Sequence, residues 1–181
     1  MKKATRRRPA GPKSAKKARA KTQAKVALLA VPGGSRARPY LIIKNAAGAV
    51  DFYRNAFDAI EVVRLEGADG RIAHCEIKIG DASILLADEW EGIGATSPSA
   101  LGGSPVVIHL EVDDVDTVAK RAIEAGAKVI FPVQDQFYGE RAGRFQDPFG
   151  HLWLLSTKIE SVSAPEMRKR ERSWLRENLD K

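Results

Sequence analysis

The sequence predicts an α+β fold of two βαβββ modules, with a basic N-terminal tail and a C-terminal helix. Two observations predict the modules: one order of strand, helix and three strands occurs twice, and a Gly/Ser/Pro-rich stretch separates the copies. A sharp change of composition marks the tail. The predicted tail is 1–37, the folded domain 38–159 with modules 38–90 and 105–158, and the helix 160–181.

The tail is the most basic part of the chain. Residues 1–38 hold thirteen Lys or Arg and no acidic residue, which leaves 17 of the 30 basic side chains against 23 acidic ones in the rest. Because the tail has no aromatic residue and no hydrophobic period, we expect it to be disordered. Its cations could attract an anionic membrane surface or give salt-sensitive, nonspecific association with nucleic acid. The alternative is that the tail is an idle extension. Pro9 and Pro12 argue against the amphipathic helix of a transit peptide.

Composition also excludes several classes of protein. No apolar run approaches the roughly 20 residues that a membrane-spanning helix needs. The single cysteine, Cys75, excludes an internal disulfide and a Cys-rich zinc site. We therefore expect a cytoplasmic protein in which Cys75 is a buried thiol.

The first predicted module begins with the strand YLIIK, followed by a helix over NAAGAVDFYRNAF, whose apolar residues recur at helical spacing. Three strands follow: AIEVVRLEG, RIAHCEIKIG and ASILLAD. In the middle strand the alternation places His74 and Glu76 on one face and Cys75 on the other.

The second predicted module repeats this order. PVVIHLEV forms its first strand, Asp114 caps a helix that ends at Gly126, and AKVIFPV, FYGERAGRFQ and HLWLLST supply three more strands. Trp153 in the last strand is expected in the core, whereas His151, after the DPFG turn, is expected at the surface.

The C-terminal segment 164–179 predicts an amphipathic helix packed as an appendage. Met167, Trp174, Leu175 and Leu179 fall near one of its faces.

Four segments in order resemble the vicinal oxygen chelate superfamily of glyoxalases, extradiol dioxygenases and bleomycin-resistance proteins, and most of all its PhnB-like branch. The segments are YLIIKNAAGAVDFY, HCEIKIGDASILLADE, LGGSPVVIHLEVDDVD and DQFYGERAGRFQDPFGHLW. The likeness covers about residues 38–158. It implies two modules that build cupped sheets, and a homodimer.

The resemblance also implies where a metal would bind. Catalytic members hold a divalent ion with four side chains, one from the first and one from the last strand of each module. Here the matching positions are Arg38, Val107, Leu154 and either Leu85 or Leu86. None of these residues supplies an oxygen or imidazole ligand, so no inherited metal site is expected.

The remaining polar residues form the candidate site. The predicted cup is lined by Tyr40, His74, Glu76, His109 and Glu111, with Asp88 as a further candidate, and by Phe137, Tyr138 and Arg141 from the loop before the seventh strand. Arg141 can offer a bidentate fork to an anion, and its alternative is an ion pair with Asp135 or Glu140. A rearranged metal site on His74 and His109 stays open, against the alternative of hydrogen-bonded strand histidines.

Three functions follow. The first is a binding module that captures a small polar or anionic molecule without metal through Tyr40, Glu76, Phe137, Tyr138 and Arg141. The second is a lyase- or dioxygenase-like enzyme that uses a rearranged metal site or His109, His74 and Glu111 as acid–base groups, so His109→Ala would lower turnover more than binding. The third is nonspecific nucleic-acid association through the tail.

Overall fold

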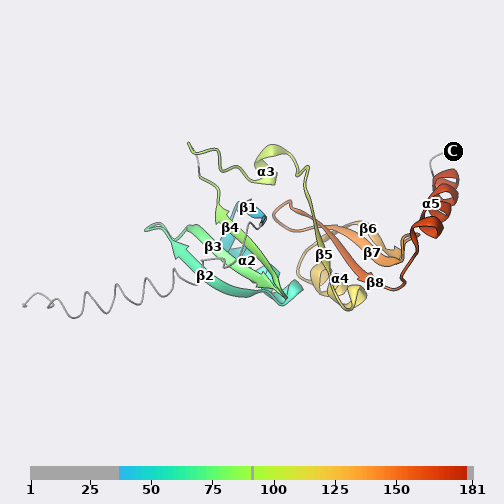
Figure 1. Ribbon diagram of the computed structural model, residues 1–181. Coiled ribbons are helices and arrows are strands. Elements are labelled where there is room, and N and C mark those ends of the chain that lie inside the picture. The colour runs from blue at the N-terminus through green and yellow to red at the C-terminus, as the bar shows by residue number, and fades with distance from the viewer. Residues whose placement is uncertain (1–36, 91, 179–181) are drawn as a thin grey trace, which may run out of the picture. The chain divides into compact units, whose positions relative to one another are not determined.

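The computed structural model describes residues 37–90 and 92–178 (Figure 1). The chain divides into the units Met1–Ala37 and Arg38–Lys181. The predictions for the basic tail and for Leu179 lie outside the described residues, so everything below concerns the second unit.

The first module has the predicted order of elements. It consists of β1 (Tyr40–Ile43), α2 (Ala46–Phe57), β2 (Ile60–Glu66), β3 (Ile72–Ile79) and β4 (Ala82–Asp88). The strands form one sheet in the order β1-β4-β3-β2, in which β1 runs parallel to β4 and the other neighbours are antiparallel.

The second module repeats this arrangement strand for strand. It consists of β5 (Val107–Glu111), α4 (Val115–Glu124), β6 (Lys128–Asp135), β7 (Glu140–Gln146) and β8 (Leu152–Lys158). Its sheet has the order β5-β8-β7-β6, with β5 parallel to β8. The repeat predicted from the sequence is confirmed.

In the part of the chain that the structure describes, two helices lie outside the repeat. The short α3 (Pro98–Leu101) lies in the stretch between the modules, where the sequence predicts no regular element. Its first residue is Pro98, and the residue that caps its end, Gly102, has a φ of 80°, which favours glycine. The predicted C-terminal helix is present as α5 (Ala164–Asn178).

Each module holds the start of its main helix with a side chain from its last strand. The Asp88 carboxylate accepts a 2.8 Å hydrogen bond from the Ala46 backbone N–H, and the Thr157 hydroxyl accepts one of the same length from Val115 N–H. The other Asp88 oxygen accepts from Ile72 N–H. Asp88, considered for the cup, therefore serves the backbone of its own module.

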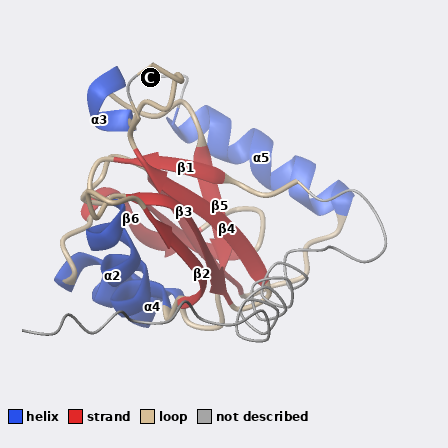
Figure 2. Cartoon of the chain, turned by 90° about the vertical axis from the view of Figure 1, so that its left-hand side faces the viewer, coloured by secondary structure: helices blue, strands red, loops and turns tan. Residues whose placement is uncertain are grey.

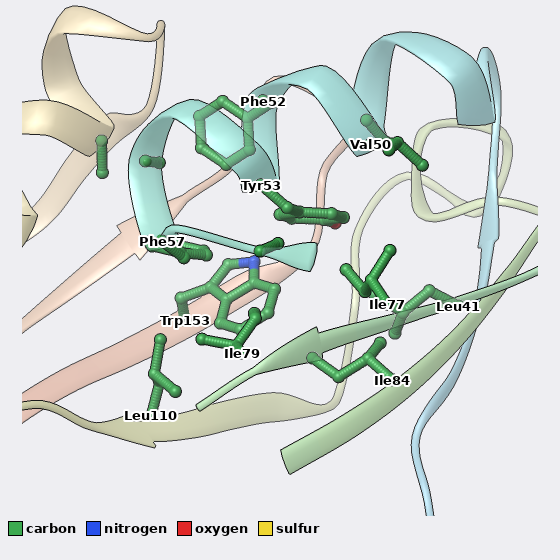
Figure 3. Close-up of a cluster of buried hydrophobic side chains, with 14 of the residues drawn as sticks. Leu41, Val50, Phe52, Tyr53, Phe57, Ile77, Ile79, Ile84, Leu110 and Trp153 are labelled. Carbon is green, nitrogen blue, oxygen red and sulfur yellow. The ribbon is translucent and has the colours of Figure 1, made fainter. Parts of the chain in front are cut away.

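The two modules share one hydrophobic core beside α2 and α4, which pack against each other (Figure 2). The Trp153 indole of β8 lies 4.8 Å from the Phe57 ring and 5.4 Å from the Tyr53 ring of α2, between ring centroids (Figure 3). Trp153 and Cys75 are buried, as predicted. Burial raises the pKa of the Cys75 thiol to about 11.

The buried Asp147 of the DPFG turn accepts four hydrogen bonds, one of which, from Tyr53, comes from the first module. One carboxylate oxygen accepts from the Tyr53 hydroxyl at 2.7 Å and from Trp153 Nε1 at 3.0 Å. The other accepts from the backbone N–H groups of Phe149 and His151. Burial, followed by the nearby Asp147 carboxylate, raises the pKa of Tyr53 well above its ordinary value.

His151 is not at the surface, so that prediction is wrong. Its side chain is buried and its Nε2 lies 3.3 Å from the carbonyl oxygen of Ile42 in β1. The DPFG turn packs where the two modules meet, which removes the residue after it from solvent. Burial lowers the pKa of His151, so the neutral imidazole is favoured.

Candidate functional site

The helix α2 packs on one face of the first sheet, and α4 packs on one face of the second. We call the opposite face of each sheet, which no helix within residues 37–90 and 92–178 covers, the open face. On β3, Cys75 and Ile77 point into the helix-covered core, and His74 and Glu76 alternate with them on the open face. On β5, Leu110 is buried and His109 lies on the opposite side. The predicted cup residues on these strands therefore do lie on the open faces.

The open face of the first sheet carries two polar links that span β4. The Tyr40 hydroxyl and His74 Nδ1 are 3.0 Å apart, and Arg38 Nη1 lies 3.2 Å from Glu76 Oε1. Because β4 separates β1 from β3, both links pass over its open-face residues, among them Leu85, the register partner of Tyr40. Partial burial raises the pKa of Tyr40, which favours the neutral phenol as a hydrogen-bonding group.

The open face of the second sheet carries a corresponding histidine. His109 pairs with Leu154 in the register, as Tyr40 pairs with Leu85 in the first sheet. Its Nε2 lies 2.8 Å from the Ser156 hydroxyl and 3.7 Å from a Glu140 carboxylate oxygen. Ser156 is fully buried, and serine and glutamate meet the same ring nitrogen, so these residues do not form a nucleophile–base–acid triad.

A cavity of about 590 Å³ brings two of the predicted residues together. Tyr40 and His109 both line it, and His74 is linked to it through its bond to Tyr40. Its other walls come from His151, α3, the chain between α3 and β5, and apolar residues of β1 and β5. Glu76 lies farther along the same open face as His74, and the exposed Glu111 shares the face of His109.

The three residues predicted from the loop before β7 lie elsewhere. Arg141 Nε and Nη2 donate to the Asp116 carboxylate of α4 at 2.7 and 2.9 Å, and Nη1 donates to Asp135 at 2.9 Å. The Phe137 ring lies 5.8 Å from the Trp174 ring of α5 and 5.2 Å from that of Tyr138.

The two-residue period of β7 explains the position of Arg141. Arg141 shares a face with Phe145, which is buried in the helix-covered core. Counting back from Phe145 would have placed Arg141 away from the cup. The same count on β8 would have added Ser156, which sequence analysis missed, to the face of His109.

The positions that the family resemblance assigns to metal ligands do not fit a divalent ion. Leu85 and Leu154 pair with Tyr40 and His109, Val107 is partly exposed on β5, and the Arg38 guanidinium contacts Glu76. Hydrocarbon side chains and a guanidinium donate no lone pair to a metal. Within residues 37–90 and 92–178, no three His, Cys, Asp or Glu side chains are grouped as metal ligands.

Comparisons with known proteins agree with this architecture. Residues 35–155 match the family described as the glyoxalase/bleomycin resistance protein/dioxygenase superfamily. An uncharacterized protein of Mycobacterium bovis is 41% identical over 133 residues, which are 72% of this chain and 88% of that protein.

Solved structures show the same fold. The crystal structure of TioX from Micromonospora sp. ML1 has a TM-score of 0.54 at 26% identity and covers 71% of this chain and 100% of that one. A Bacillus cereus PhnB protein, described as a putative 3-demethylubiquinone-9 3-methyltransferase, has a TM-score of 0.54 at 16% identity, over 68% of this chain and 99% of its own. With both βαβββ modules present, the chain belongs to the glyoxalase/bleomycin resistance protein/dioxygenase superfamily.

Proposed function

We propose that the protein binds a small polar molecule in the cavity lined by Tyr40 and His109, by side-chain contacts in place of a metal ion. The observation that carries this proposal is that two polar side chains, at corresponding register positions of the repeat, line one cavity. Its volume of about 590 Å³ and its mixture of apolar walls with a few polar groups are typical of small-molecule sites.

The geometry favours a polar ligand over an anionic one. The expectation of an anionic ligand depended on Arg141. Its guanidinium is bound by Asp116 and Asp135 on the helix-covered side of the sheet. The cavity itself offers hydrogen-bonding groups, the phenol of Tyr40 and the imidazole of His109, beside apolar walls of Ile42 and Val107. Recognition by direct hydrogen bonds also agrees with the lack of metal-binding side chains at the family's ligand positions.

An acid–base enzyme is the second candidate, favoured by the contacts of the two histidines. His74 bonds the Tyr40 phenol, and His109 lies within reach of Ser156 and Glu140, so both rings belong to polar networks that can move a proton. Glu111 is exposed on the same face as His109. This alternative uses the same cavity, so ligand binding is the property to establish first.

Substitution of the cavity residues tests the proposal. Tyr40→Ala and His109→Ala are each expected to weaken binding of a neutral polar probe, benzamide, about tenfold, the equivalent of one lost hydrogen bond with its packing. Dissociation constants come from NMR titration of the full chain. Asp81→Asn, in the exposed β3–β4 turn, is the matched control and should leave binding unchanged. Equal affinities in all four proteins would contradict the proposal.

We also propose a homodimer that covers the open faces. Ile60 and Leu65 of β2 pair in register with open-face residues of β3, and Phe131 of β6 pairs with Arg144, yet all three apolar side chains are more than half exposed. Pairing of two copies through these faces would bury the exposed apolar side chains, which favours association. Light scattering of the eluted protein should give twice the chain mass, and Phe131→Asp should shift it toward the monomer. A monomeric wild-type protein at tens of micromolar would contradict the dimer.

Partners beyond these stay predictions. Among the described residues no helix is both long and apolar enough to cross a membrane. Nucleic-acid association through the tail predicts that deletion of residues 1–35 abolishes retention on a DNA column.

A further inference from the structure

Glu76 is the buried acid of the open face. Only 6% of the residue is exposed, although it lies on the face without a covering helix. Its Oε1 accepts a 2.9 Å hydrogen bond from the Ser83 hydroxyl and lies 3.2 Å from Arg38 Nη1. Its Oε2 is buried and has no hydrogen-bond partner within the described part of the chain. A buried carboxylate oxygen without a hydrogen-bond donor lowers the stability of the fold, so this atom is an acceptor whose bonding capacity is unsatisfied.

Arg38, the cation beside Glu76, meets only part of the hydrogen-bonding capacity of the Glu76 carboxylate. Arg38 precedes β1 and reaches across β4, and the pair that it forms joins one nitrogen to one oxygen. Arginine and carboxylate form their strongest pairs with two parallel bonds. The Arg38 side chain is 27% exposed, so it can turn into solvent, whereas Glu76 cannot. Glu76 is the partner with unmet bonding capacity.

The surroundings of Glu76 suit a flat ligand. Val63 and Leu85 are its register partners on the neighbouring strands and form apolar walls on both sides. The rings of Tyr40 and His74 lie next along the same face, 5.7 Å apart between centroids, and Tyr40 is 47% exposed. A planar group bound to the Glu76 carboxylate can therefore contact an exposed aromatic ring.

We infer that Glu76 recognises a planar nitrogen cation, an amidinium or guanidinium group of the ligand, which displaces Arg38 and donates to both carboxylate oxygens. This inference rests on the proposed binding function and names the chemical class of its ligand. Arg38 is then an internal competitor that neutralises Glu76 when no ligand is bound. The unsatisfied hydrogen-bonding atom belongs to Glu76 and not to Arg38. The structure therefore favours a cationic ligand bound to Glu76 over an anionic ligand bound to Arg38.

Three probes of one shape and different charge test the inference: benzamidine as a cation, benzamide and benzoate. NMR titrations of the full chain at pH 8 would compare wild type with Glu76→Gln, Arg38→Ala and the milder Arg38→Gln. We expect wild type to prefer benzamidine to benzoate. Glu76→Gln should weaken benzamidine at least about tenfold, because a charge-assisted pair is lost. Removing Arg38 should strengthen it several-fold. Lys78→Ala, two residues along the same face, should leave the benzamidine affinity within about twofold of wild type.

The opposite pattern overturns the inference. If benzoate binds better than benzamidine and Glu76→Gln strengthens benzoate, Arg38 is an anion receptor, and the proposed binding function stands while the cationic class fails. A second result would also overturn the cationic class while the proposed binding function stands. In it, benzamide binds at Tyr40 and His109, but benzamidine at about 50 mM, a concentration at which weak fragments bind, does not bind wild type or either Arg38 variant. If none of the three probes shifts an open-face amide in any variant, both the inference and the proposed function fail.

Discussion

Asp147→Ala is expected to lower the free energy of unfolding by about 3–5 kcal/mol. The carboxylate is buried and accepts four hydrogen bonds, from Tyr53, Trp153 and two backbone N–H groups. Alanine leaves all four donors without this acceptor. Since Tyr53 lies in the first module and Trp153 in the second, the loss falls where the modules meet.

Two milder variants separate the contributions of Asp147. Tyr53→Phe removes one of the four bonds and should cost about 1–3 kcal/mol. Asp147→Asn keeps one side-chain oxygen as acceptor and should fall between Tyr53→Phe and alanine. Urea unfolding followed by circular dichroism measures each value. A loss below about 1 kcal/mol for Asp147→Ala would show that this carboxylate does not hold the modules together.

Trp153→Ala is the second large effect and is expected to cost about 3–5 kcal/mol. The indole is 1% exposed and packs against Tyr53 and Phe57 of α2, so its removal leaves a cavity between β8 and the helix of the other module. Trp153→Phe keeps a ring but loses the bond from Nε1 to Asp147, and should cost less than alanine.

A double-mutant cycle links the two predictions. Trp153 and Asp147 touch, so Trp153→Ala combined with Asp147→Ala should cost less than the sum of the single losses. Strict additivity within 0.3 kcal/mol, on the order of the error of such cycles, would show that the two residues act independently. Asp147 accepts from the backbone of His151, a cavity residue, so each variant's benzamide affinity is measured beside its stability.

Strand periodicity explains which parts of the fold could be predicted. The order of elements, the repeat, the cap at Asp114 and the burial of Trp153 and Cys75 all follow from local patterns, and the structure confirms them. The short α3 escaped because four residues are too few for a helical period. His151 escaped because its burial depends on how the second module packs against Ile42 of the first.

The site was less predictable than the fold, because a residue's partners come from other strands. Alternation places His74 and Glu76 on one face, but it cannot show that Tyr40 bonds His74 across β4 or that Arg38 reaches Glu76. For Arg141 the sequence left two alternatives, a ligand fork and an ion pair with Asp135 or Glu140. The structure has the ion pair with Asp135 and adds a second partner, Asp116 of α4, which is distant in sequence.

The most direct test of the central claim is to record NMR spectra of the full chain with benzamide, first with EDTA and then with one equivalent of Mn²⁺. The claim that side chains, without a metal, form the binding site predicts shifts at the amides of Tyr40, Ile42, His109 and His151 in EDTA. It also predicts no selective broadening by Mn²⁺ near Leu85 and Leu154. Binding that requires Mn²⁺, with broadening centred on those leucines, would contradict it.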